Sequence, residues 1–259
     1  MDVAVVAADL RSEQDALDAV VADLTDEQWE TATPSPGWTV ADQIGHLTYF
    51  DGTAALAIAD AGAFKASLEE LLSSGDGMEA MTLKRDLKPS ELLSAWRTNR
   101  GLLAEQAAGL ADGDRVPWYG PSMGAKSFLT ARLMETWAHG QDVVDAVGGE
   151  RTATDRLRHI AQLGFITRGW TYVNRGVDVP VGDVRLHLTG PGGEAWRFGA
   201  DDATDVVRGP ALDFCLVVTQ RRHVDDTALE ITGDVARDWL EKAQVFAGPP
   251  TDGPRPRRG

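Results

Sequence analysis

The residues best suited to chemistry lie in two short segments of the first half of the chain. One of them, Met134–Asp142, places Glu135 and His139 four residues apart and Asp142 three residues further on. Residues with this spacing share one face of a helix and lie about 6 Å apart. Two interpretations are open. Either this stripe faces solvent, or it is buried beside partners that offset the cost of removing charged groups from water.

The other segment, Trp38–Leu47, carries His46 in the middle of an expected helix. A single helical histidine is more often a packed or surface residue than a metal ligand. However, one ligand from one helix and an i,i+4 pair from another are how helical bundles build metal sites. Two imidazoles and one carboxylate would leave open coordination positions, which is typical of catalytic zinc and of non-haem iron(II). We therefore take His46, Glu135 and His139 as candidate metal ligands.

Four expected helices in the first half would position these side chains. Their apolar periodicity covers residues 3–23, 39–62, 90–110 and 122–147. Thr39 follows the helix-breaking segment Pro34–Gly37 and can cap the second helix, with Asp42 three residues later. The pair Gly148 and Gly149 ends the fourth helix. A further short helix is expected within residues 63–88.

The second half of the chain has a different pattern, in which helices and short strands are mixed. Residues 155–174, 209–220 and 234–246 are expected to be helical. Alternating apolar and polar residues predict strands, with Gly190–Gly193 as a hairpin turn; the strands are Val184–Thr189, Ala195–Phe198, Ala203–Arg208 and Ala228–Thr232. We therefore predict an α+β protein: an N-terminal four-helix bundle in residues 1–150, a smaller α+β domain in 151–247, and a disordered Pro- and Arg-rich tail in 248–259.

Composition excludes several classes of function. The chain has 259 residues and a formal net charge of −15, and a surface this acidic repels nucleic-acid phosphates. No apolar run is long enough to span a membrane, and the first residues make a poor signal peptide. The single cysteine, Cys215, rules out an intramolecular disulfide and a cysteine-built zinc site. We expect a cytoplasmic protein that binds neither nucleic acid nor membrane.

The two segments also resemble a known family. The pattern T-x-x-P-G-W-T-V-x-D-Q-I-G-H-L, followed about 90 residues later by E-T-W-x-H-G-Q-D, resembles the DinB-like metalloproteins. It is most similar to their mycothiol-dependent maleylpyruvate isomerase branch, and the resemblance extends to about residue 247. The resemblance implies a metal-binding four-helix bundle followed by a smaller α+β domain. It places the family's metal ligands on His46, Glu135 and His139.

The resemblance implies two more site residues. The aspartate that follows the second ligand histidine falls on Asp142, which would hold a ligand histidine or shuttle a proton. In the isomerase branch an arginine of the C-terminal domain lines the active site, and the candidates here are Arg221 and Arg222. We choose Arg222, whose guanidinium could clamp a substrate carboxylate. Alternatively, both are solvated arginines at a helix end, where they favour the helix dipole.

These observations lead to one main hypothesis and two alternatives. The main one is a metal-dependent enzyme that uses a low-molecular-weight thiol of the mycothiol type to isomerise a small electrophilic acid or to transfer the thiol to it. Zinc is the expected metal, with Fe²⁺ or Ni²⁺ as alternatives. A thiol-independent hydrolase or lyase that uses metal-bound water also stays open, as does a non-catalytic metal- or ligand-binding protein. The acidic surface does not help to attract an anionic substrate.

Overall fold

The protein consists of two compact units. The computed structural model describes residues 2–73 and 85–257, and its internal contacts separate Met1–Glu150 from Arg151–Gly259. The first unit is helical and the second combines helices with a small sheet, so the chain is an α+β protein. Among the described residues, no helix is long and apolar enough to cross a membrane.

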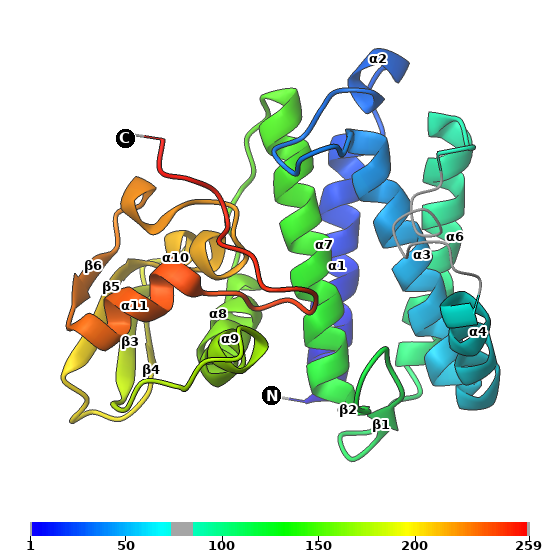
Figure 1. Cartoon of the computed structure of the whole chain (residues 1–259). Coiled ribbons are helices and arrows are strands. Elements are labelled where there is room, and N and C mark those ends of the chain that lie inside the picture. Colours follow the sequence, from blue (N-terminus) through cyan, green and yellow to red (C-terminus); the bar gives the residue numbers. More distant parts are fainter. Residues whose placement is uncertain (1, 74–84, 258–259) are drawn as a thin grey trace. The chain divides into compact units, whose positions relative to one another are not determined.

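Four long helices form the first unit, as predicted. They are α1 (Val3–Val21), α3 (Val40–Ala59), α6 (Pro89–Ala107) and α7 (Ala125–Val147). The helices lie side by side (Figure 1), and α7 and α6 each contact both α1 and α3, which closes the bundle. The shorter elements are α2 (Asp26–Trp29), α4 (Ala61–Ser73) and the two-residue strands β1 (Arg115–Val116) and β2 (Met123–Gly124). Helix α4 confirms the extra helix expected there, and residues 74–84 of that segment lie outside the described residues.

The interior of the bundle follows from the spacing of its apolar residues. On α1 the buried residues Val6, Leu10, Leu17 and Val21 recur at helical spacing, so they line one face. That face joins a core contributed by all four long helices and by Trp29 of α2. This core holds α3 and α7, the two helices that carry the candidate ligands, in contact with each other.

Local signals position both ligand-bearing helices. Thr39 is the N-cap of α3: its hydroxyl accepts a hydrogen bond from the backbone N–H of Asp42, whose carboxylate accepts one from the N–H of Thr39. This reciprocal pair confirms the predicted capping box. Helix α7 ends at Gly148, which has a φ of 69° in the left-handed region that glycine adopts without strain. The predicted stop at this glycine is therefore also confirmed.

The second unit contains a four-stranded mixed sheet. Its strands are β3 (Val184–Thr189), β4 (Ala195–Phe198), β5 (Asp205–Pro210) and β6 (Glu230–Thr232), in the order β4-β3-β5-β6. Strands β3 and β4 form the predicted hairpin, whereas β3 and β5 run parallel. The helices are α8 (Leu157–Ile166), α9 (Arg168–Asn174), α10 (Ala211–Val218) and α11 (Asp234–Lys242), with a 3-10 turn, η1, at Val224–Asp226.

Several boundaries in the second unit differ from those expected. The helix expected over residues 155–174 is two helices, α8 and α9, and the last two strands begin two residues later than expected, at Asp205 and Glu230. Strand β5 continues to Pro210, so the helix expected over residues 209–220 covers only Ala211–Val218. The reason is local: Gly209 has a φ of 141°, outside the helical region, and Pro210 is extended at the N-cap. Helix α11 ends at Lys242 instead of residue 246. In the tail, the N–H of Thr251 bonds the side chain of Gln244; the expected disorder of residues 248–259 stays a prediction.

Candidate metal centre

The three candidate ligands converge on one point between two packed helices. His46 comes from α3, whereas Glu135 and His139 come from successive turns of α7. One potential ligand atom from each residue lies within 4.8 Å of the other two. Oε2 of Glu135 is 3.6 Å from Nε2 of His46 and 3.1 Å from Nε2 of His139. The i,i+4 pair and the histidine of the facing helix are therefore brought together.

Burial decides between the two interpretations of the stripe on α7. His139 is only 9% exposed and Asp142 only 2% exposed, while the side chain of Glu135 is 22% exposed. The stripe thus faces the interior of the bundle and not solvent. The carboxylate of Glu135 is partly exposed and lies at the edge of this interior.

The electrostatics of His46 and Glu135 favour the forms that bind cations. Burial lowers the pKa of His46 to about 4, and the nearby imidazole of His139 adds to this effect. The His46 ring is therefore neutral at neutral pH. Burial alone would raise the pKa of Glu135, but hydrogen bonds with His139 and His46 outweigh it and hold that pKa well below its usual range. An ionised carboxylate therefore faces a neutral imidazole.

This donor set fits a divalent metal ion. Neutral imidazole nitrogen and carboxylate oxygen are ligands that zinc, iron(II) and nickel share. One potential ligand atom from each of the three residues lies within 4.8 Å of the other two, so a single ion could contact all three. Three protein ligands leave at least one coordination position for a small molecule, which is the arrangement of catalytic zinc sites.

Aromatic rings surround the two imidazoles. Trp38 stacks on His139, with ring centroids 5.8 Å apart and an interplanar angle of 12°, and lies 5.3 Å from the ring of His46. Phe50 also packs against His46, with ring centroids 4.5 Å apart. Phe50 in turn contacts Tyr119 at 5.5 Å. The ligands are thus flanked by apolar surfaces, which restrict the motion of the rings and reduce the access of water.

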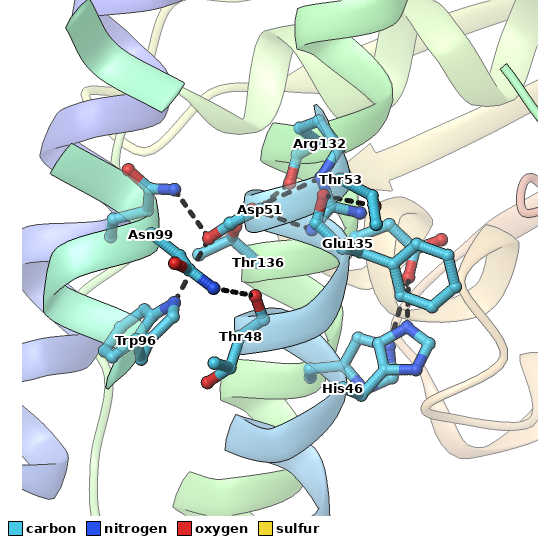
Figure 2. A network of polar contacts seen from close by, with 12 residues as sticks. His46, Thr48, Asp51, Thr53, Trp96, Asn99, Arg132, Glu135 and Thr136 are labelled. Atoms are coloured by element: carbon cyan, nitrogen blue, oxygen red, sulfur yellow. Dashed lines mark hydrogen bonds and ion pairs between the residues drawn. The ribbon is translucent and has the colours of Figure 1, made fainter. Parts of the chain in front are cut away.

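A buried polar network lies next to the candidate ligands on the same two helices. Asp51 of α3 is wholly buried and accepts hydrogen bonds from Arg132 of α7 at 2.8 Å, from Trp96 of α6 at 3.1 Å and from Gln14 of α1 at 2.9 Å. Figure 2 shows Asp51 within this network, with His46 and Glu135 beside it. One carboxylate therefore links all four long helices, which fixes the spacing of α3 and α7.

Comparison with known proteins now identifies the family. The family model described as the mycothiol maleylpyruvate isomerase N-terminal domain matches residues 10–144, a segment that contains all three candidate ligands. The chain belongs to this family. It is 45% identical over 248 residues to the uncharacterized protein Rv0036c of Mycobacterium tuberculosis strain H37Rv, covering 95% of this chain and 96% of the relative. The uncharacterized protein MT0041 of strain CDC 1551 / Oshkosh matches with the same values, 45% identity and 95% and 96% coverage.

Solved structures show the same fold. The crystal structure of the mycothiol-dependent maleylpyruvate isomerase superposes with a TM-score of 0.59, at 16% identity, over 91% of this chain and 94% of that chain. A variant of that enzyme, with one histidine replaced by alanine, superposes with a TM-score of 0.58 at 15% identity, again over 91% and 94%. The likeness therefore includes the second unit as well as the helical bundle.

Within this member of the mycothiol maleylpyruvate isomerase family, Asp142 lies one turn beyond His139 on α7. Its Oδ2 accepts a hydrogen bond from the hydroxyl of Ser35 at 3.0 Å. Both ring nitrogens of His139 face other groups: Nε2 faces Glu135, and Nδ1 lies 2.5 Å from Oε1 of Gln43. The group that holds this ring is therefore Gln43.

Gln43 was not among the site residues expected from the sequence, although a signal was present. Gln43 lies three residues before His46 on α3, so both side chains share one face of that helix. Gln43 is fully buried. A fully buried amide must find hydrogen-bond partners, and the nearest polar side chains on that face are those of the site.

The two candidate arginines belong to the second unit, just beyond the end of α10. Their backbone N–H groups both bond the carbonyl of Leu216, at 2.8 Å from Arg221 and 3.2 Å from Arg222. Nη1 of Arg221 donates to the carbonyl of Thr219 at 2.6 Å, and Nη1 of Arg222 donates to the carbonyl of Arg221 at 2.7 Å. These contacts are typical of cations at a helix C-terminus, and a role for Arg222 in substrate binding is a proposal.

Proposed function

We propose that this protein is a metal-dependent enzyme that uses a low-molecular-weight thiol of the mycothiol type on a small electrophilic acid. The observation that carries the proposal is the convergence of His46, Glu135 and His139 within 4.8 Å, in a chain of the mycothiol maleylpyruvate isomerase N-terminal domain family. The reaction is isomerisation if the thiol leaves again and thiol transfer if it stays on the product.

The three ligands and their neighbours divide the work at the metal. His46, Glu135 and His139 would hold the ion, with zinc as the first choice and Fe²⁺ or Ni²⁺ as alternatives. A bound divalent ion supplies the positive charge that keeps a thiol sulfur deprotonated. Trp38 and Phe50, which flank the imidazoles, limit the access of water to that sulfur. Low local polarity strengthens the attraction between opposite charges at the site.

Two further residues have proposed roles. Asp142 is buried one turn beyond His139, and its carboxylate would accept and return the proton that the substrate exchanges. Arg222 would bind a carboxylate of the substrate through its guanidinium. A local cation would be useful because the formal net charge of −15 does not help to attract an anionic substrate.

Elemental mass spectrometry of the purified protein tests the metal site first. Wild type, purified without chelators and reloaded with zinc, should hold about one equivalent, the occupancy of a single site. The variants His46→Ala and His139→Ala should lose it. His187→Ala is the matched control, because His187 lies on strand β3 of the second unit. A wild-type protein that holds no zinc after reloading would overturn the proposal.

Thiol dependence then separates the enzyme classes. With zinc-loaded protein and maleylpyruvate as the probe, turnover should require mycothiol and should stop when it is omitted. Turnover that continues without thiol would instead support a hydrolase or lyase that uses metal-bound water. A protein that binds zinc but no mycothiol in calorimetry would support a non-catalytic binding protein.

A further inference from the structure

A directional chain of hydrogen bonds leads from the backbone to one of the candidate ligands. It starts at the carbonyl oxygen of Trp38, which accepts from the hydroxyl of Thr33 at 2.9 Å. A hydroxyl has one proton to donate. Because Thr33 donates its proton to this carbonyl, its oxygen can only accept from its next neighbour. That neighbour is Gln43, whose Nε2 lies 2.8 Å from the hydroxyl oxygen.

The orientation of the Gln43 amide follows from this constraint. Only the NH₂ group of an amide can donate, so Nε2 must face Thr33 and Oε1 must point the other way. Oε1 lies 2.5 Å from Nδ1 of His139. Because a carbonyl oxygen only accepts, Nδ1 must carry a proton. The tautomer of His139 is thus set by three hydrogen bonds whose polarity begins at a backbone carbonyl.

The consequence appears at the opposite nitrogen of the ring. With a proton held on Nδ1, the nitrogen through which the ring can bind a cation is Nε2, which lies 3.1 Å from Oε2 of Glu135. Nε2 is therefore directed at the point where the three candidate ligands converge. Metal-binding histidines commonly donate their second N–H to a carbonyl or carboxylate in this way.

We infer that Gln43 is a positioning residue of the metal centre: through Thr33 and Gln43 the backbone carbonyl of Trp38 fixes the tautomer and the orientation of the His139 ring. The inference rests on the proposed metal-dependent function. Gln43 is fully buried on α3, on the same helix as His46, so one helix supplies both a ligand and the group that orients a ligand from α7. Because its amide is neutral, Gln43 orients the His139 ring without adding a second negative charge beside Glu135.

Zinc affinity is the first measurement, by competition with a chelator of known affinity. The variant Gln43→Leu should bind zinc about 10- to 100-fold more weakly, the range typical for loss of such a partner. Thr33→Val removes the hydroxyl that orients the amide, so it should weaken zinc in the same direction but less. Gln43→Glu still offers an acceptor to Nδ1, and Thr33→Ser keeps the hydroxyl, so both should stay within a few-fold of wild type.

A matched control separates positioning from general stability. Gln14 is another buried glutamine of the bundle, on α1, and its side chain bonds Asp51 at 2.9 Å. Gln14→Leu should lower the unfolding temperature and leave zinc affinity unchanged. Wild-type zinc affinity in Gln43→Leu would overturn the inference, and so would equal losses of affinity in Gln43→Leu and Gln14→Leu.

The tautomer itself gives a readout that does not depend on metal. In ¹⁵N NMR spectra of the metal-free protein, His139 of wild type should show a protonated Nδ1, and Gln43→Leu should lose this preference. A wild-type protein that binds no zinc would refute the proposed function, while this spectrum would still test the hydrogen-bond chain. An Nε2-protonated neutral ring in wild type would overturn the inference directly.

Discussion

Asp51 and Arg132 form an ion pair at 2.8 Å that is almost completely removed from solvent inside the helical bundle. Asp51 follows His46 on α3 by five residues, and Arg132 precedes Glu135 on α7 by three. The pair therefore joins the two helices that carry the candidate ligands, close to the ligands themselves (Figure 2). Because the same carboxylate also bonds Trp96 and Gln14, its loss would affect the packing of all four long helices.

Removing this carboxylate should strongly destabilise the protein. In Asp51→Ala the guanidinium of Arg132 stays buried without its counter-charge, and breaking one side of such a pair costs about 3–5 kcal/mol. The measurement is the free energy of unfolding from urea denaturation. The control is Asp15→Ala, since Asp15 pairs with Arg100 at 2.7 Å with 59% of its side chain exposed; exposed pairs contribute about 0–1 kcal/mol. Equal losses in the two variants would contradict the prediction.

Metal binding should stabilise the fold by an amount that grows with the logarithm of the zinc concentration above the dissociation constant. A ligand that binds only the native state adds about 2.7 kcal/mol at 100 times its dissociation constant. Thermal unfolding should therefore shift upward with zinc and return to its starting value after EDTA is added. His46→Ala should abolish the shift and His187→Ala should keep it. A shift that survives His46→Ala would show that the zinc effect arises elsewhere in the chain.

Asp42 should make the stability of the bundle depend on pH. Burial would raise the pKa of Asp42, but hydrogen bonds from Arg85 and Thr39 outweigh it and hold that pKa below its usual value. A carboxyl with a lowered pKa in the folded state stabilises above its unfolded pKa of about 4, and this contribution is lost as pH falls through the folded value. Asp42→Asn should therefore cost about 1 kcal/mol near pH 7, the usual size of a capping contribution.

The difference between wild type and Asp42→Asn should shrink as pH falls below about 4, and it should level off once pH is below the lowered folded pKa of Asp42, where both side chains are neutral. Denaturant unfolding at a series of pH values measures it. Arg85→Met removes the ion-pair partner at 2.7 Å and should reduce the same pH dependence without removing the capping box. A constant difference between wild type and Asp42→Asn from pH 3 to pH 7 would show that ionisation of Asp42 does not contribute to stability.

Sequence patterns were informative where one local rule determined the outcome. The i,i+4 spacing placed Glu135 and His139 on one face, and the capping box at Thr39 set the start of α3. The burial of Asp51 and Arg132 was not predictable from the sequence. Nothing in the local pattern distinguishes them from ordinary exposed charged residues, and they become buried only when α3 and α7 pack together. Gln43 was missed for a similar reason: its contacts with Thr33 and His139 depend on tertiary packing.

The position of Gln43 on the helix was readable from the sequence, but its partner Thr33 lies in the segment before α3. The conformation of that segment depends on tertiary contacts, such as the hydrogen bond from Thr33 to Trp38. In the sheet, the parallel pairing of β3 with β5 joins strands that are distant in sequence, and no local signal specifies it.

The role of Arg222 can be tested against its neighbour. If Arg222 binds a substrate carboxylate, Arg222→Ala should lower kcat/KM, mainly through KM, because a hydrogen bond to a charged group contributes about 1.5–3 kcal/mol. Arg222→Lys should recover only part of the loss, since a lysine cannot replace the bidentate guanidinium. Zinc content should not change in either variant. Arg221→Ala is the matched control, because Arg221 follows the same helix end and also bonds a backbone carbonyl. A loss of activity confined to Arg221→Ala would assign substrate binding to Arg221 instead of Arg222. No loss in either variant would show that neither arginine binds the substrate.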